Sequence, residues 1–437
     1  MRRDAVRSPE DLYRRPNALA PHYSAFRVQE RLLLTGHSHQ AWPDRGFEGQ
    51  RRAWEDAAEC VDEKWERAFE RAARVRAGFA RLLGDSADRI ALASSTHDLV
   101  VRFLSACPLR ERPRLVTTDG EFHTIRRQLD RLAEEGLEVV RVSRDPVSTV
   151  ATRLAERIDD RTAAALVSSV FYEDARIVRG LGEVARACER RGAELLMDAY
   201  HSLNAVPLSL GGEGLEGAFV VGGGYKYCQL GEGNCFLRFP TGREFRPAIT
   251  GWFSEFGALE GTRGAPLAGR GRPPSGPDGA LERGTSTERE EGADQGPTPV
   301  VYGRGPDRFA GSTYDPTSHY RAAEVFAFCE EEGLAPEFLR EVSQHQVGLL
   351  AERFDELDAD PRLIRRDRSM DLGELGGFLA LRSPRAAEIS RLLRERDVRT
   401  DHRGELLRLG PAPYLCDDQL REAMAALGEV VGALSRG

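Results

Sequence analysis

The stretch AAALVSSVFYEDARIVRGLGEVARACERRGAELLMDAYHS, residues 163–202, decides the fold. Its two ends carry continuous Val, Leu, Ala and Met runs, which are typical of strands buried on both faces. The segment between them, GLGEVARACERRG (180–192), places apolar residues at helical spacing. A strand, a helix and a second strand in this order predict a βαβ unit in a parallel sheet.

The same alternation extends outward in both directions. Five more apolar runs predict strands, with helical segments between most of them: RIALAS (89–94), RLVTTD (114–119), LEVVRVS (137–143), GAFVVGG (217–223) and NCFLRFP (234–240). We therefore expect an α/β protein with a large domain built on a mostly parallel, seven-stranded sheet covered by helices. The loops at the carboxyl ends of its strands should carry the chemistry.

The remaining chain divides by composition. Residues 260–306 lose all periodicity and become rich in Gly, Pro, Glu and Arg, which predicts a flexible surface insertion. Helical and strand patterns then alternate to the end, as in a smaller α+β domain. We predict a large domain at 61–325, a small C-terminal domain at 326–437, and an N-terminal segment (1–60) that contributes to the small domain and the active site.

Composition narrows the class of protein. The 437 residues are 41% hydrophobic, and the formal net charge of -8 gives no reason to expect nucleic acid or an anionic membrane as a partner. No apolar run approaches the about 20 residues that span a bilayer. The N-terminus lacks the apolar region of a secretory signal, and seven scattered cysteines form no CxxC pair. We expect a cytoplasmic protein with reduced cysteines.

Lysine is rare in this chain. Only Lys64 and Lys226 occur among its 62 basic residues. Lys64 lies in VDEKWERAFERAARVR (61–76), a charged helical stretch where a surface role suffices. Lys226 lies between a buried strand and a Gly-rich loop, and a desolvated lysine can lose its proton and attack a carbonyl, which arginine cannot. We therefore predict that Lys226 binds pyridoxal 5′-phosphate (PLP) covalently.

Three further features suit a PLP site. Ser94, Ser95 and Thr96 stand at a strand–turn–helix junction, where hydroxyl and backbone N–H groups can hold a phosphate, although a plain N-cap would use the same residues. Asp198 ends an apolar strand, so its buried carboxylate needs a cation such as a pyridinium nitrogen, unless it only caps the loop. His201 follows three residues later and could lie against the ring.

The segments around Asp198 and Lys226 also resemble a known family. MDAYHSLNAVPLSL (197–210) and GGGYKYCQLGEGN (222–234) resemble the Asp-x-x-His and Tyr-Lys-Tyr segments of kynureninase, in the class V aminotransferase superfamily of PLP enzymes of fold type I. Weaker similarities lie in LTGHSHQAWPD (34–44), ASSTHDL (93–99), EFHTI (121–125), ITGWFSEF (249–256), FAGST (309–313) and LLRLGPAPYL (406–415). Together they cover most of the chain.

The resemblance implies roles for individual residues of the cofactor site. It implies covalent attachment at Lys226, a pyridine-nitrogen contact at Asp198 and a supporting contact from His201. The resemblance further implies that the phosphate and ring are held by Ser95, Thr96, Phe122 and Tyr225.

Other implied residues concern the substrate and a second subunit. Trp252 and Ser312 would complete the phosphate pocket across the interface of a homodimer. Arg408 would grip the α-carboxylate of a small amino-acid substrate, and His37 is a further substrate-binding candidate. Core aromatics and a surface arginine are the simpler interpretations of Phe122, Trp252 and Arg408.

The sequence also departs from the family. Ile125 stands where an acid is expected, Thr313 where an asparagine is expected, and residues 59–69 hold no counterpart of the histidine that meets the substrate's aryl group. His37 and His39 occupy the N-terminal motif instead. A His-x-His pair without a third ligand does not make a metal site, so we predict none.

The resemblance implies a PLP-dependent hydrolase of tryptophan catabolism. It would cleave the Cβ–Cγ bond of kynurenine or a related γ-keto amino acid to alanine and a carboxylic acid. A class V aminotransferase, a desulfurase or a β- or γ-lyase shares the same cofactor half. A desulfurase needs a reactive cysteine on a mobile loop, and neither Cys228 nor Cys416 suits that role. A non-catalytic homologue would not need the lysine, aspartate and histidine together.

Overall fold

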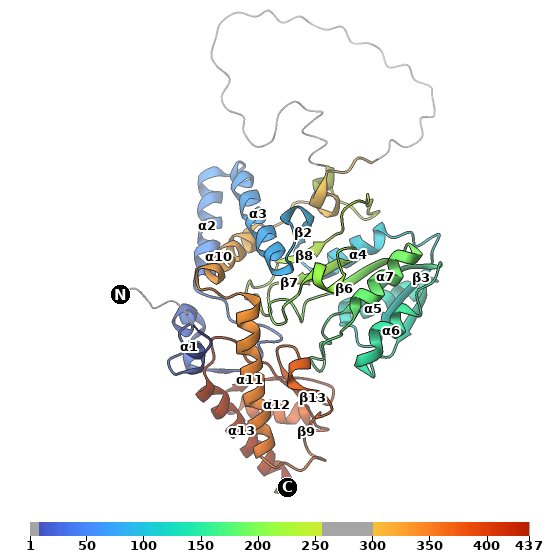
Figure 1. Cartoon of the computed structure of the whole chain (residues 1–437). Helices are drawn as coiled ribbons and strands as arrows, with labels where there is room; N and C mark the ends of the chain where they lie inside the picture. The colour runs from blue at the N-terminus through green and yellow to red at the C-terminus, as the bar shows by residue number, and fades with distance from the viewer. Residues whose placement is uncertain (1–7, 256–299, 437) are drawn as a thin grey trace, which may run out of the picture.

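The computed structural model describes residues 8–255 and 300–436. Its centre is a seven-stranded sheet with the order β2-β8-β7-β6-β5-β3-β4 (Figure 1). The strands are β2 (Ile90–Ala93), β3 (Arg114–Thr118), β4 (Glu138–Val142), β5 (Thr162–Ser168), β6 (Glu194–Asp198), β7 (Phe219–Gly223) and β8 (Cys235–Arg238). The pairings among β3 to β7 are parallel, whereas β8 runs antiparallel to both β2 and β7. The predicted mostly parallel, seven-stranded sheet is confirmed.

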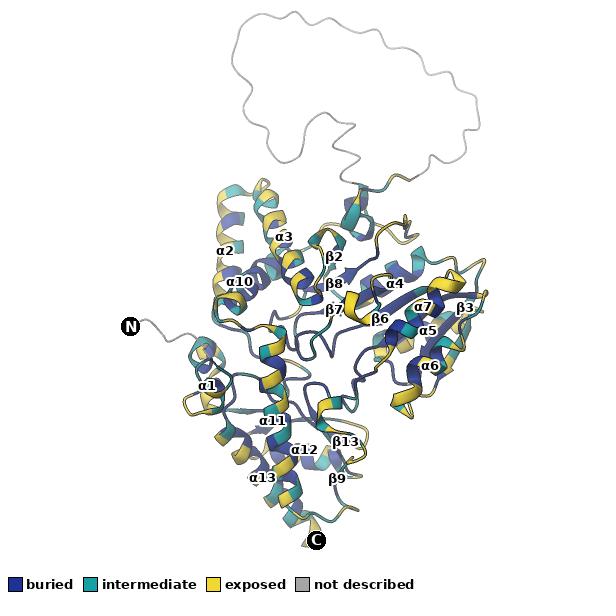
Figure 2. Ribbon diagram, viewed as in Figure 1, coloured by how far each residue is buried: buried dark blue, intermediate teal, exposed yellow. Residues whose placement is uncertain are grey.

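Alternate side chains of the strands enter two separate cores. On β5, Ala164 and Leu166 face one core and Ala165 and Val167 face the other. The sheet is therefore buried on both faces, as its continuous apolar runs predict. In Figure 2 the inner strands are mostly dark blue, while the edge strand β4 is largely intermediate and the surrounding helices carry exposed residues. These helices include α3 (Lys64–Leu83), α4 (Thr96–Ala106), α5 (His123–Glu134), α6 (Val150–Ala155) and α7 (Leu181–Arg191).

A second sheet lies in the C-terminal region. It has the order β12-β13-β10-β9, and its strands are β9 (Arg365–Arg366), β10 (Leu379–Arg382), β12 (Asp401–Arg403) and β13 (Leu406–Leu409). The helices α11 (Pro336–Glu356), α12 (Ala386–Arg394) and α13 (Asp417–Arg436) contribute to the core around it. This separate, smaller sheet confirms the predicted α+β character of the C-terminal region.

The N-terminal segment joins that second body. The short strand β1 (Leu32–Leu33) pairs in parallel with β11 (Val398–Arg399), and Thr35 bridges to Gly410. Leu12 and Tyr23 share a core with the C-terminal helices. This arrangement carries residues 34–44 to the edge of the second sheet, although the exact domain boundaries at 60/61 and 325/326 stay a prediction.

One helix of the C-terminal half of the chain packs against two helices of the N-terminal half. The helix α10 (Thr317–Glu331) packs against α2 (Arg45–Cys60) and α3.

Residues 260–299 of the predicted insertion lie outside the described residues, and Gly305–Phe309 form a short 3-10 helix. Within residues 8–255 and 300–436, no helix is long and apolar enough to cross a bilayer.

Candidate active site

A cavity opens where the parallel strands end. Ser168 is the last residue of β5 and pairs in register with Asp198, the last residue of β6. The loop after β7 carries Lys226 to the same edge. The cavity is lined by Thr96, Phe122, Thr124, Ser168, Val170, Tyr172, Asp198, Tyr200, His201, Tyr225 and Lys226. Six residues predicted from sequence therefore meet in one cavity.

The amine of Lys226 is enclosed by this cavity. Lys226 is only 5% exposed, and its Nζ lies 2.6 Å from Nε2 of His201. The rings of Tyr200, Phe122 and Tyr225 surround it, with centroids 4.6, 5.4 and 5.7 Å from Nζ. Burial lowers the pKa of Lys226 to about 7 although the carboxylate of Asp198 acts to raise it. Near neutral pH a large fraction of the amine is therefore neutral and nucleophilic.

The lowered pKa makes a testable prediction for the protein without ligand. Only the neutral amine reacts with formaldehyde, so reductive methylation of Lys226 is expected to rise with increasing pH through about 7 and then level off. Brief labelling over a pH series, followed by peptide mapping, measures this profile. A rise centred near the ordinary lysine value of about 10.5 would contradict the assignment.

His201 is the closest polar neighbour of that amine. Burial lowers its pKa well below the usual histidine value, and the nearby Lys226 lowers it further, so the imidazole is neutral. Its Nδ1 is buried without a hydrogen-bond partner among the described residues. The sequence-based role of His201, support of Asp198, stays a prediction, since the contact in the structure is with Lys226.

Asp198 adds a buried carboxylate to the same cavity. It is 8% exposed, and its Oδ1 accepts a hydrogen bond from the backbone N–H of Tyr200 at 2.8 Å. Burial raises its pKa, while that hydrogen bond and the charge of Lys226 lower it. One hydrogen bond and the nearby Lys226 are the partners that stabilise this buried charge, so a further cation in the cavity would be favourable.

The start of α4 meets the cavity at Thr96. Ser95 is the N-cap of this helix, and its hydroxyl oxygen accepts a hydrogen bond from the backbone N–H of Asp98 at 3.2 Å. The structure therefore uses Ser95 as a cap, which the sequence already allowed, and Ser95 does not line the cavity. Its predicted phosphate contact stays a prediction.

Trp252 and Ser312 lie away from the cavity. Trp252 begins a 3-10 helix and is 45% exposed, and Ser312 is exposed on a loop. Neither lines the cavity that this chain forms by itself. Their predicted role requires a second subunit and stays a prediction.

The two substrate-binding candidates meet a residue that sequence reasoning missed. The Arg408 guanidinium is bound to the carboxylate of Asp401 by two hydrogen bonds, and Nε2 of His37 lies 2.9 Å from Oδ1 of Asp401. His39 points elsewhere and stacks on Tyr225. The described residues contain no group of three side chains that could hold a metal ion.

Glu121 is a second residue that the sequence did not single out. It is 2% exposed, and its carboxylate accepts hydrogen bonds from the hydroxyl groups of Thr118 at 2.5 Å and Ser168 at 2.6 Å. Burial raises its pKa to about 7. In the sequence, Glu121 is only an acid directly before Phe122. Its contact with Ser168 depends on β3 and β5 lying side by side.

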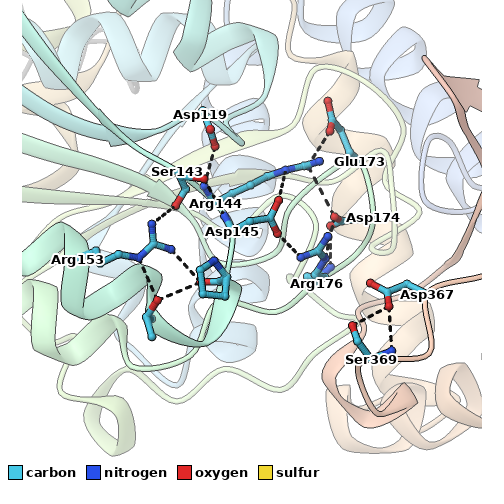
Figure 3. A network of polar contacts seen from close by, with 12 residues as sticks. Asp119, Ser143, Arg144, Asp145, Arg153, Glu173, Asp174, Arg176, Asp367 and Ser369 are labelled. Carbon is cyan, nitrogen blue, oxygen red and sulfur yellow. Dashed lines mark hydrogen bonds and ion pairs between the residues drawn. The ribbon is translucent and has the colours of Figure 1, made fainter.

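The loop that supplies Tyr172 is held by a network of ion pairs (Figure 3). Arg144 pairs with Glu173 at 2.6 Å, and Arg176 pairs with Asp145 at 2.5 Å and with Asp174 at 2.9 Å. These contacts flank Tyr172 on the chain. They fix the backbone of a loop that lines the cavity.

Comparison with known proteins agrees with this geometry. No family model matches the chain. An uncharacterized aminotransferase of Bacillus subtilis, YcbU, is 24% identical over 364 residues, which cover 82% of this chain and 84% of that protein. A kynureninase of Xanthomonas campestris is 27% identical over 197 residues, but this match covers only 41% of this chain and 45% of that protein.

Solved structures share the fold at low sequence identity. The C-DES mutant with glycine covalently linked to its PLP cofactor has a TM-score of 0.74 at 13% identity, with 94% of this chain and 98% of that chain covered. A cysteine desulfurase of Thermococcus onnurineus has a TM-score of 0.71 at 14% identity, with coverage of 98% and 99%. The relatives support a class V aminotransferase-like superfamily member, and the solved structures share its fold.

Proposed function

We propose that this chain is a PLP-dependent enzyme that hydrolyses the Cβ–Cγ bond of kynurenine or a related γ-keto amino acid. The observation that carries the cofactor assignment is the buried Lys226 amine with its lowered pKa, beside Asp198 and the neutral His201. The hydrolytic assignment is supported by the similarity to kynureninases over part of the chain.

The residues of the cavity fit PLP chemically. Asp198 offers a buried carboxylate to a protonated ring nitrogen, and Phe122 and Tyr200 offer aromatic faces. Thr96 at the first turn of α4 offers a phosphate the positive end of a helix. Lys226 offers an amine that is neutral enough to attack an aldehyde. When bound, PLP supplies an electron sink for negative charge at the substrate α-carbon.

The protein's own residues would then divide the work. Lys226 would hold the cofactor covalently, and its Nζ would be the base that accepts the substrate α-proton. His201, at 2.6 Å, orients that amine. Asp198 keeps the ring nitrogen protonated. Water would add to the γ-carbonyl, the Cβ–Cγ bond would break to give the carboxylic acid, and Cβ would take up a proton to give alanine.

A direct assay tests the reaction. The PLP-loaded protein, incubated with L-kynurenine or 3-hydroxykynurenine, is expected to release alanine and the corresponding anthranilate in equal amounts. Chromatography of both products measures this. Turnover that appears only after a 2-keto acid is added would overturn the hydrolase assignment and establish a transaminase.

An aminotransferase is the second candidate. It is favoured by one observation, because the relative named aminotransferase matches twice as much of this chain as the kynureninases do. Desulfurase chemistry is a weaker candidate, since Cys228 is buried, burial raises its pKa, and Cys416 is buried as well. A buried thiol of this kind is a poor nucleophile.

The assembly and location are part of the same proposal. A cytoplasmic homodimer would bring Trp252 and Ser312 of one subunit toward the cavity of the other. Their exposure on this chain leaves both accessible to a neighbouring subunit.

A further inference from the structure

Arg408 lies in a hairpin directly opposite an acid. Asp401 of β12 and Arg408 of β13 are paired residues of neighbouring antiparallel strands, and the connecting turn contains Gly404. Nε and Nη2 of Arg408 donate to Oδ1 and Oδ2 of Asp401 at 2.8 and 2.5 Å. One complete edge of the guanidinium is therefore closed by an internal carboxylate.

The Nη1 end of the guanidinium contacts the loop that lines the cavity, although Arg408 itself is not a lining residue. Nη1 of Arg408 donates to the backbone carbonyl of Tyr172 at 2.5 Å, and Tyr172 lines the cavity. A guanidinium has five N–H donors. These three hydrogen bonds leave one donor on Nη1 and one on Nη2 without a partner among the described residues. Two donors at the end of a guanidinium form a second fork that fits a carboxylate.

His37 braces the same acid from the N-terminal segment. It is fully buried, and burial lowers its pKa to about 4, so its ring is neutral. The carboxylate of Asp401 can only accept, so Nε2 of His37 carries the proton and donates to Oδ1 at 2.9 Å. Asp401 is thus held by Arg408 of the same hairpin and by His37 of the N-terminal segment, and it forms a longer ion pair with Arg403 at 3.7 Å.

The pair also acts on the catalytic amine. The charge of Arg408 lowers the pKa of Lys226, and the charge of Asp401 raises it. Arg408 and Asp401 therefore lie within electrostatic reach of Nζ.

We propose that Asp401 is a positioning residue for the substrate α-carboxylate: by closing one edge of Arg408, it directs the free Nη1 and Nη2 donors toward that carboxylate. This inference rests on the proposed function. It adds that the chain selects substrates with a carboxylate on the α-carbon through a fork held by Asp401 and His37, rather than through a freely mobile arginine.

The test compares two ligands that differ only in the carboxylate. Binding of L-alanine and of ethylamine to the PLP-loaded protein is followed by the change in cofactor absorbance. In Asp401→Asn, the dissociation constant for L-alanine is expected to rise about tenfold or more, the equivalent of one lost charge-assisted contact, while that for ethylamine is unchanged.

Two further variants keep the test decisive. Asp401→Glu retains the charge but displaces the guanidinium, so it should weaken L-alanine binding and leave ethylamine unchanged even if the asparagine variant fails to fold. Glu405→Gln removes the same charge from the same hairpin at an exposed pair with Arg382, and it should change neither ligand.

Different outcomes would overturn the role of Asp401 and the proposed function. Equal L-alanine affinity in wild type and both Asp401 variants would overturn the role of Asp401 alone. Parallel losses for L-alanine and ethylamine would overturn it as well, because they would indicate general damage to the site. A wild type whose absorbance responds to no amino acid would overturn the proposed function itself.

Discussion

Replacing Lys226 with arginine is expected to lower turnover by about 1000-fold or more, because both the cofactor anchor and the proton acceptor are lost. Arginine also places a basic side chain beside Asp198 and His201. It stays protonated at ordinary pH and cannot attack an aldehyde. Steady-state kinetics of the variant, with PLP in excess, measures the loss.

The other lysine of the chain is the matched control. Lys64 is the first residue of α3 and does not line the cavity. Lys64→Arg should retain full activity and cofactor content. An active Lys226→Arg variant, or a loss of activity in Lys64→Arg alone, would contradict the assignment.

The second large effect is expected at Asp198. Asp198→Asn keeps the size of the side chain and still offers an oxygen to the N–H of Tyr200, but it cannot neutralise a protonated ring nitrogen. We expect turnover to fall about 100-fold or more and PLP affinity to drop. Turnover and equilibrium dialysis of PLP measure the two effects.

A control for that substitution lies at the end of a neighbouring strand. Asp119 follows β3 and accepts a hydrogen bond from the backbone N–H of Arg144 on the surface, outside the cavity. Asp119→Asn removes the same charge at a similar place in the sheet. It should leave PLP binding intact, and an unchanged Asp198→Asn would mean that the ring nitrogen is not held there.

The central sheet could be predicted because its signal is local. Each strand of a sheet buried on both faces is a continuous apolar run, and the seven runs of this chain became the seven strands from β2 to β8. The direction of each strand was harder to predict from the sequence. That β8 inserts antiparallel between β2 and β7 depends on the turn after Lys226 and on long-range packing, not on the composition of NCFLRFP.

Some residues of the site could likewise be predicted from local patterns, and others could not. Asp198 ends β6, and His201 and Lys226 follow β6 and β7 within three residues, so strand prediction alone brings them to one edge of the sheet. Asp401 became important only through its cross-strand partner Arg408 and through His37, which is 364 residues away. Such a contact is set by the register of the hairpin and by the packing of the N-terminal segment, and neither is written in a local pattern.

The central claim, covalent attachment of PLP at Lys226, has one direct test. The purified protein is incubated with PLP, reduced with borohydride and digested, and the modified peptide is identified by mass spectrometry. We expect a single pyridoxyl-lysine, at Lys226 in the peptide that contains GGGYKYC. Modification of Lys64 alone, or of no lysine, would contradict it.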